Sequence, residues 1–369
     1  MKNIGRWAIT LGFSVVFIAA CSKGGDGDDN PPPPIDEYYA YVVGHLGSVY
    51  GFTIDKSTGA LMRMYGPSFP TWDENWAVAC NPSGKYVYVG GRDMHVFEID
   101  AATGQLTTMY GSPFKVGSFI RSIALDSSGK FIFFTSTNMV SVYKIYAPTG
   151  GLLPIPGSPF FSGNGATSVT VHPSDKFAYV TNAGYGNSVT AFRINAETGE
   201  VTYVPGSPYF VESGPTSVAV DPSGKFAYVA NRDSDNISAL AINAETGALT
   251  AVADSPFAVG DHPLSVAIDP SGKFLYVANS ESNDVSAFSI NTVTGALIPV
   301  AGSPFSAGFY PQFVTVDPSG KFAYVINSYS DNVSAYTIHA TTGALTAVVG
   351  SPFAIVDRPQ GIAIIHIAQ

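Results

Sequence analysis

Histidine and carboxylate side chains that could do acid–base chemistry are few in this sequence and scattered. His262 precedes Pro263 in an expected loop and could act as a general base if a carboxylate oriented its ring. We expect the adjacent Asp261 to point elsewhere, so a surface loop histidine is the alternative. The remaining histidines lack metal-ligand spacing and lie at positions 45, 95, 172, 339 and 366. The sequence therefore predicts no metal site and no cofactor.

Aromatic, guanidinium and amide side chains form a second candidate set. Trp76, Arg121, Gln312 and Gln360 each stand just before or within an apolar run, at one position of a recurring unit. Gathered around a concave mouth, such groups would suit a small polar ligand such as a sugar or a sugar acid. The alternative is that they only line and plug a channel. The same face is expected to carry Trp72, Asp73, Glu74, His262, Tyr310 and Arg358.

Seven repeats supply the elements that must position these residues. The stretch Asp221-Pro222-Ser223-Gly224-Lys225-Phe226-Ala227-Tyr228-Val229-Ala230-Asn231 recurs with drift along the chain. Its tyrosine, or Phe133, falls at 41, 88, 133, 179, 228, 276 and 324, a period of 45 to 49 residues. Self-similar units of this length indicate a repeat architecture.

Each unit reads as four short strands, a to d. In the unit beginning at Pro215 we expect strands at 216–220, 225–230, 237–242 and 248–252. Asp-Pro-Ser-Gly is typical of a type I turn between strands a and b. A Thr-Gly pair recurs between strands c and d, and its glycine suggests a left-handed backbone position. Gly-Ser-Pro-Phe, or a variant, then leads to the next unit.

Alternation along strand b places Phe226 and Tyr228 on one face of the sheet and Ala227 and Val229 on the other. Seven such sheets, packed large against small, predict an all-β, seven-bladed β-propeller of four-stranded antiparallel blades. The first unit lacks strand a, whereas residues 361–367 form a strand a with nothing after it. We expect this C-terminal strand to complete blade one and close the ring, with the propeller spanning residues 38–369.

The Tyr179-Val180-Thr181-Asn182 motif and the Asp-Pro-Ser-Gly-Lys turn resemble those of Tyr-Val-Thr-Asn repeat propellers and of the related lactonase-like propellers, which include 6-phosphogluconolactonase. The resemblance covers about residues 38 to 367 and implies the propeller fold. In that family, active-site candidates are an Arg-His pair before strand a and a glutamate after strand b. Here only Arg121 matches, and the histidine position holds Ala77, Ser122, Ser168, Ser217, Ser265, Phe313 and Gly361.

The N-terminal residues indicate export. Lys2 and Arg6 precede a short apolar segment, and residues 1–20 read as a signal peptide that ends in Ile18-Ala19-Ala20-Cys21. This end resembles a bacterial lipobox, which implies that Cys21 is acylated and anchors the protein to a membrane. Residues 21–37 read as a flexible Gly/Asp/Pro tether. Ser22 implies the outer membrane of a Gram-negative cell envelope, with the domain facing either the periplasm or the outside.

Two functional hypotheses remain open, besides a purely structural envelope protein. A net charge of −10 disfavours nucleic acid as a partner. The first hypothesis is a lipid-anchored module that binds a small polar ligand or an envelope protein. The second, implied by the resemblance, is a lactone hydrolase in which Arg121 contacts the lactone and Glu74 or Glu212 transfers a proton. Convergence of Arg121 with an acidic residue at the mouth would favour the enzyme.

Overall fold

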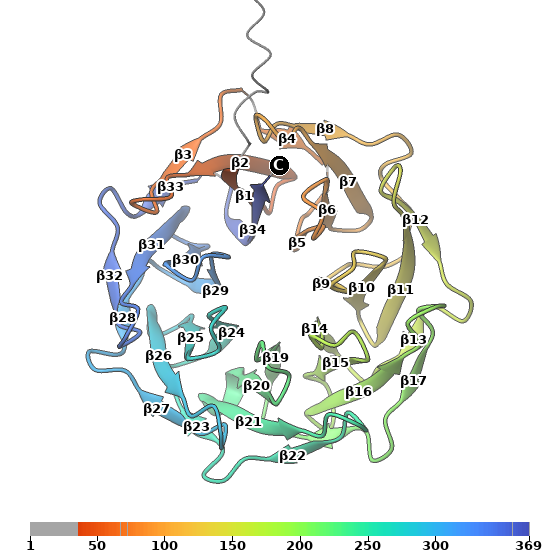
Figure 1. The fold of residues 1–369 in the computed structure, drawn as a ribbon, viewed down its shortest axis with the longest axis vertical. Coiled ribbons are helices and arrows are strands. Elements are labelled where there is room, and N and C mark those ends of the chain that lie inside the picture. Colours follow the sequence, from red (N-terminus) through yellow and green to blue (C-terminus); the bar gives the residue numbers. More distant parts are fainter. Residues whose placement is uncertain (1–35, 67, 72, 356, 369) are drawn as a thin grey trace, which may run out of the picture. The chain divides into compact units, whose positions relative to one another are not determined.

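The computed structural model describes residues 36–368 except Pro67, Trp72 and Val356. Seven antiparallel sheets are arranged as blades around a common centre (Figure 1). The predicted signal peptide, Cys21 and most of the predicted tether lie outside the described residues. Within the part of the chain that is described, no helix is long and apolar enough to cross a membrane.

The inner strands, a and b, surround this centre in ring order (Figure 1). Strand a of blades one to seven is β34 (Pro359–Ala368), β5 (Ala77–Cys80), β9 (Ser122–Leu125), β14 (Ala166–Val171), β19 (Pro215–Val220), β24 (Pro263–Ile268) and β29 (Pro311–Val316). Strand b is β1 (Asp36–Gly44), β6 (Tyr86–Gly90), β10 (Phe131–Ser136), β15 (Phe177–Asn182), β20 (Phe226–Asn231), β25 (Phe274–Asn279) and β30 (Phe322–Asn327).

The outer strands, c and d, complete each blade. Strand c is β2 (Ser48–Ile54), β7 (Met94–Ile99), β11 (Met139–Tyr146), β16 (Ser188–Ile194), β21 (Asn236–Ile242), β26 (Asp284–Ile290) and β31 (Asn332–Ile338). Strand d is β3 (Leu61–Arg63), β8 (Leu106–Thr108), β12 (Gly151–Pro154), β17 (Val201–Tyr203), β22 (Leu249–Ala251), β27 (Leu297–Pro299) and β32 (Leu345–Ala347). A 3-10 turn, η1 (Arg232–Ser234), follows β20.

A fifth short strand in six blades refines the predicted four-stranded pattern. Most of these strands begin at the Phe or Tyr that ends the Gly-Ser-Pro-Phe segment, and each pairs with strand c of its own blade. They are β4 (Phe69–Pro70), β13 (Phe160–Phe161), β18 (Tyr209–Phe210), β23 (Phe257–Ala258), β28 (Phe305–Ser306) and β33 (Phe353–Ala354). Blade two has a single bridge, between Met94 and Phe114. The crossing segment therefore adds main-chain pairing to the blade that it leaves.

The predicted ring closure is confirmed. β34 pairs antiparallel with β1 from Asp36↔Ala368 to Val43↔Gly361, so the two ends of the chain share one blade. β1 begins at Asp36, two residues before the expected start of the propeller. A side-chain cluster reinforces this seam, because Asp36 Oδ2 accepts a hydrogen bond from Lys56 and Asp36 Oδ1 lies 2.6 Å from Nε2 of His366. The ring is thus held closed by hydrogen bonds between strands and between side chains.

Each strand-b aromatic packs over the Thr-Gly turn of the next blade. The Thr-Gly glycine has a positive φ in every blade, between 68° and 78°, as the sequence predicted. A Cβ added at Gly295 would lie 2.4 Å from Cδ1 of Phe226. Tyr228, which is fully buried, donates its hydroxyl to the Gly295 carbonyl at 3.0 Å. Glycine is therefore required both by the backbone conformation and by the aromatic ring that covers it.

Replacing this glycine should loosen the contact between blades. Gly295→Ala should lower the free energy of unfolding by about 2–4 kcal/mol, because a left-handed alanine costs about 1–2 kcal/mol and the overlap with Phe226 costs about as much again. Gly302→Ala is the matched control, since Gly302 has φ of 89° but the nearest atom to its added Cβ is 3.6 Å away. Urea unfolding measures both. Equal losses in the two variants would show that packing against Phe226 contributes nothing.

The closing seam should respond to acid. Hydrogen bonds from Lys56, first, and His366 hold the pKa of the Asp36 carboxyl below its ordinary value of 3.8. Because the folded-state pKa is the lower one, the stabilisation is complete above about pH 4 and is lost as the pH falls through the folded pKa. Asp36→Asn should therefore lower the melting temperature at pH 7, and this difference should shrink below about pH 4. Glu37→Gln serves as the control, and a pH-independent effect of Asp36→Asn would contradict the assignment.

Candidate functional site

The position that carries Trp76, Arg121, Gln312 and Gln360 lies at the start of strand a, at one end of the inner ring of strands. At three of the seven equivalent positions, held by Thr167, Thr216 and Gln312, the side chain bonds to the following blade. Thr167 Oγ1 donates to the Pro215 carbonyl at 2.8 Å, and Thr216 Oγ1 donates to the Pro263 carbonyl at 3.0 Å. These side chains thus link blade four to five, blade five to six and blade seven to one.

Gln312 and Gln360 take part in the same linkage. The Gln312 amide donates to the main-chain carbonyl and to the side-chain Oε1 of Gln360, each at 2.9 Å. The Gln360 amide donates to the Arg358 carbonyl at 2.8 Å and lies 3.2 Å from Ser328 Oγ. Both amide NH₂ groups are therefore occupied within the protein, and a ligand would have to displace these bonds.

Trp76 and Arg121, in contrast, line a pocket. The pocket has a volume of about 270 Å³ and lies between blades two and three, lined by Glu74, Trp76, Phe119, Ile120, Arg121 and Thr137. The guanidinium of Arg121 and the carboxylate of Glu74 have no hydrogen-bond or ion-pair partner among the described residues. The structure thus brings a carboxylate, a guanidinium and two aromatic rings to one pocket, where both charged groups are available to a ligand.

Hydrogen bonds anchor the loop that carries Glu74 and Trp76. Asn75 is fully buried, and its amide donates to the Gly44 carbonyl at 3.2 Å while its Oδ1 accepts the Thr71 hydroxyl at 2.9 Å. Trp76 N–H continues the blade by donating to the Gly90 carbonyl at 2.8 Å. The buried amide therefore anchors the loop to blade one, while the residues on either side face the pocket.

Main-chain and carboxylate contacts also fix the other wall of the pocket. Arg121 N–H donates to the Thr135 carbonyl at 3.0 Å, which places Arg121 at the start of blade three. Asp73 accepts N–H bonds from Glu74 at 2.9 Å and from Arg92 at 2.7 Å. The Arg92 guanidinium stacks 4.9 Å above the ring of Phe119. Pairing of Asp73 with Arg92 leaves Glu74 as the acid that lines this pocket.

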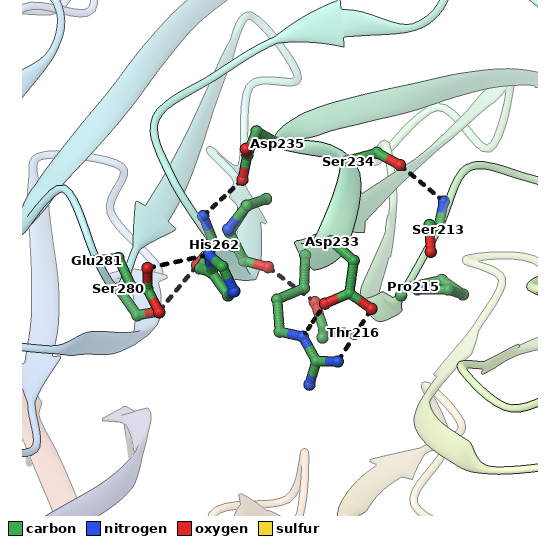
Figure 2. Close-up of polar contacts among 12 residues, drawn as sticks. Ser213, Pro215, Thr216, Asp233, Ser234, Asp235, His262, Ser280 and Glu281 are labelled. Carbon is green, nitrogen blue, oxygen red and sulfur yellow. Dashed lines mark hydrogen bonds and ion pairs between the residues drawn. The ribbon is translucent and has the colours of Figure 1, made fainter.

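The other candidate acids and bases lie elsewhere. Glu212 is exposed in the loop between β18 and β19 and does not line the pocket of Arg121. His262 is in blade six, where its Nδ1 lies 3.4 Å from Glu281 Oε2 and its N–H donates to Asp235 at 2.8 Å (Figure 2). The carboxylate beside His262 is thus Glu281, from the loop between β25 and β26 of the same blade, and not the adjacent Asp261.

Charges in the neighbouring loop of blade five are already paired. The Arg232 guanidinium donates to both carboxylate oxygens of Asp233, at 2.6 and 3.0 Å (Figure 2). These bonds raise the pKa of Arg232 and lower that of Asp233. Blades five and six therefore present a paired, polar surface, unlike the pocket between blades two and three.

Asp and Asn side chains of the b-to-c loops bond to the main chain at the entry to the next blade. Asp235, Asn283 and Asp331 accept main-chain N–H bonds from His262, Tyr310 and Arg358, which precede strand a of the next blade, at 2.8 to 2.9 Å. Among the described residues, no three histidine, cysteine or acidic side chains are grouped as metal ligands. Burial raises the pKa of the Cys80 thiol to about 12, so this thiol is protonated at neutral pH. Trp72 lies outside the described residues.

Sequence reasoning missed several neighbours of the pocket. Phe119 and Thr137 lie in loops whose contacts depend on how two blades meet. His45 stands edge-on to Trp76, with ring centroids 5.3 Å apart. The repeat offered one signal for His45, because His45 directly follows strand b of blade one. That signal is weakened by Gly44, which stands where an asparagine ends strand b in four later blades.

A comparison of the sequence with models of known protein families identifies the family of this chain. The model described as Lactonase, 7-bladed beta-propeller, matches residues 33–158, 152–262, 211–305 and 261–356. The chain belongs to this family. The structure confirms the seven-bladed propeller fold that the resemblance implied. No curated protein matches the chain.

Solved structures of the same fold come from several bacteria. A putative 6-phosphogluconolactonase from Bacteroides uniformis has 19% identity and a TM-score of 0.78, covering 89% of this chain and 100% of its own. Another from Bacteroides fragilis has 20% identity and a TM-score of 0.77, covering 92% and 100%. A periplasmic gluconolactonase from Pseudomonas aeruginosa has 17% identity and a TM-score of 0.76, covering 89% and 99%. At these identities the likeness concerns the fold.

Proposed function

We propose that this protein of the lactonase family hydrolyses a lactone, with a sugar lactone as the substrate class. The observation that carries the proposal is that Glu74 and Arg121 line one pocket with neither charged group paired among the described residues. Trp76 and Phe119 add aromatic surface, against which the apolar face of a sugar ring can stack. Structural likeness to a periplasmic gluconolactonase is consistent with this class of substrate.

The chemistry requires a proton acceptor and a stabiliser of negative charge. Glu74 accepts a proton from water as the water oxygen forms a bond to the lactone carbonyl carbon. The Arg121 guanidinium donates hydrogen bonds to the carbonyl oxygen, which becomes negatively charged in the tetrahedral intermediate. The bond between that carbon and the ring oxygen then breaks, and the ring oxygen takes a proton. The product is an open hydroxy acid, in which all atoms of lactone and water are retained.

Substitutions that remove the charge of Arg121 or of Glu74 should test the two proposed roles one at a time. Arg121→Ala and Glu74→Gln should each lower kcat/KM for glucono-1,5-lactone by about 100-fold or more, because each removes a group that acts in the transition state. Arg121→Lys should restore part of the activity, since it keeps a positive charge but loses the planar pair of donors. A pH-stat measures the acid released, after subtraction of spontaneous hydrolysis.

Arg63→Ala is the control, because Arg63 lies in the outer strand β3 and contacts the ring of Tyr50. It should leave turnover unchanged. Wild-type protein that binds the lactone without turnover would instead favour the ligand-binding module. No binding and no turnover would overturn both readings of this pocket.

We further propose that the propeller works in the bacterial cell envelope, anchored through lipid on Cys21. The lipobox-like end Ile18-Ala19-Ala20-Cys21 supports this, and Ser22 favours the outer membrane. At least two acyl chains give stable anchoring, whereas one gives only reversible binding. The tether of residues 21–37 would hold the propeller away from the bilayer.

Lipidation can be tested directly. Cells that express the protein should incorporate radiolabelled palmitate into it, and Cys21→Ser should abolish the label and release the protein from the membrane fraction. Cys80→Ser is the matched control and should keep both label and location. Equal labelling of the Cys21→Ser variant and the wild type would contradict the anchor.

A further inference from the structure

The hairpin between β10 and β11 of blade three supplies one wall of the pocket. Ser136 pairs with Met139, so this loop holds only Thr137 and Asn138. The corresponding loops of blades four to seven are longer and span residues 183–187, 232–235, 280–283 and 328–331. Thr137 lines the pocket together with Arg121, which belongs to the same blade. The short hairpin thus contributes directly to the candidate site.

This hairpin also lacks a contact that the longer loops make. In blades four to seven the first loop residue donates its N–H to a carbonyl of the segment before strand a, as Ala183 does to Gly165 at 2.9 Å. The equivalent residues of blade three are Thr137 and Phe119, and no such bond joins them among the described residues. Both line the pocket instead. The pocket therefore lies where the usual loop contact of the repeat is missing.

The backbone of Thr137 is strained. Its φ is 34°, and among the described non-glycine residues with a positive φ it is the one with a β-branched side chain. A positive φ at the first residue of a two-residue hairpin loop is the pattern of a type II′ turn, which favours glycine there. In the longer loops the left-handed residue is Asn187, Asp235, Asn283 or Asp331, residue types that tolerate this conformation. Strain of this kind is typical of a functional constraint.

Contacts with the segment that enters blade four hold the turn in place. The Thr137 carbonyl accepts the N–H of Ala166 at 2.7 Å, and Asn138 Oδ1 accepts the N–H of Gly165 at 2.8 Å. The Thr137 hydroxyl, in contrast, has no hydrogen-bond partner among the described residues, and the residue is exposed. The main chain of this turn is therefore fixed, while the hydroxyl is available to a ligand in the pocket.

The size and lining of the pocket restrict the ligand. Its volume of about 270 Å³ is below the range of about 300–1,000 Å³ that is typical of sites for drug-sized ligands. A single sugar ring is a ligand of suitable size. The Thr137 hydroxyl can both donate and accept a hydrogen bond, as a ring hydroxyl of a sugar also can. It is thus the neutral polar group of a lining that otherwise offers charges and apolar surface.

We propose that Thr137 is a substrate-binding residue, whose hydroxyl forms a hydrogen bond with a ring hydroxyl of the lactone. The pocket then selects hydroxylated monocyclic lactones over unsubstituted ones. This inference rests on the proposed function. Arg121 binds the carbonyl oxygen of the lactone, and Thr137, at the same end of blade three, binds a hydroxyl elsewhere on the ring. A lactone without hydroxyl groups leaves Thr137 bonded to water and gains no affinity from it.

The strain at Thr137 can be measured without a ligand. Thr137→Gly should raise the melting temperature by about 1–3 °C, because glycine adopts a left-handed conformation without a Cβ clash. Ala183→Gly is the matched control, since Ala183 directly follows strand b of blade four and has no positive φ. It should lower the melting temperature. A lower melting temperature in Thr137→Gly would contradict the strain on which the inference rests.

Two lactones test the recognition of a hydroxyl group. Thr137→Val keeps the branched shape but removes the hydroxyl, so KM for glucono-1,5-lactone should rise about 10-fold with little change in kcat. The ratio of kcat/KM for glucono-1,5-lactone to that for δ-valerolactone, which has no hydroxyl groups, should fall by the same factor. Thr137→Ser keeps the hydroxyl and should recover most of this loss. An unchanged ratio in Thr137→Val overturns the inference.

Binding of D-glucono-1,5-lactam, a stable analogue, separates this inference from the hydrolase. Calorimetry should show about 10-fold weaker binding to Thr137→Val than to the wild type. That result in a protein that turns over neither lactone supports the role of Thr137 and overturns the hydrolase. Equal binding by the two proteins, or no binding by the wild type, overturns the role of Thr137.

Discussion

The contact between a strand-b aromatic and the Thr-Gly turn of the next blade is the interaction on which the ring depends. At six of the seven junctions a tyrosine hydroxyl reaches the glycine carbonyl, from Tyr41 to Gly104 around to Tyr324 to Gly59. Phe133 lacks the hydroxyl, and there Phe131 alone covers Gly199. Burial raises the pKa of these tyrosine hydroxyls, which stay neutral donors. Because the bond joins different blades, it fixes their spacing as well as their stability.

Seven buried clusters show how this contact is extended. Each cluster lies at one junction between consecutive blades, for example blades five and six around Tyr228 and Leu275. The inner rim adds polar links, from Thr167, Thr216 and Gln312 to the following blade. Side chains that belong to these links are not available to a ligand. Trp76 and Arg121, at the same position of blades two and three, make no such link among the described residues and line the pocket instead.

These departures explain why the candidate site lies to one side of the common centre. Trp76 and Arg121 replace the small hydroxyl residues of blades four and five, and Glu74 stands in a loop held by the buried Asn75. His45 and Asp357 occupy the seam at which the ends of the chain meet. At this seam Gly44 stands where four later blades have an asparagine. A side chain at this position would overlap the Asp357 carboxylate, because a Cβ added at Gly44 would lie 2.3 Å from its Oδ2. The loop that carries Glu74 and Trp76 is thus anchored, through Asn75 and Gly44, to the blade that closes the ring.

The sequence by itself determined the blade count, the strand order, the left-handed Thr-Gly glycines and the closure by the C-terminal strand. These features depend on local turn residues and on the alternation of large and small side chains along each strand. Both patterns recur in every repeat, so a copy that has diverged can still be identified from the other copies. The pairing of side chains across blades was decided only by the tertiary structure. The sequence suggested that Asp261 points away from His262, but it could not name Glu281 as the carboxylate that lies there. It also offered Glu212 as an acid, which does not line the pocket of Arg121. Contacts such as His45 with Asp357 join residues 312 positions apart (357 − 45), and no local pattern encodes that distance.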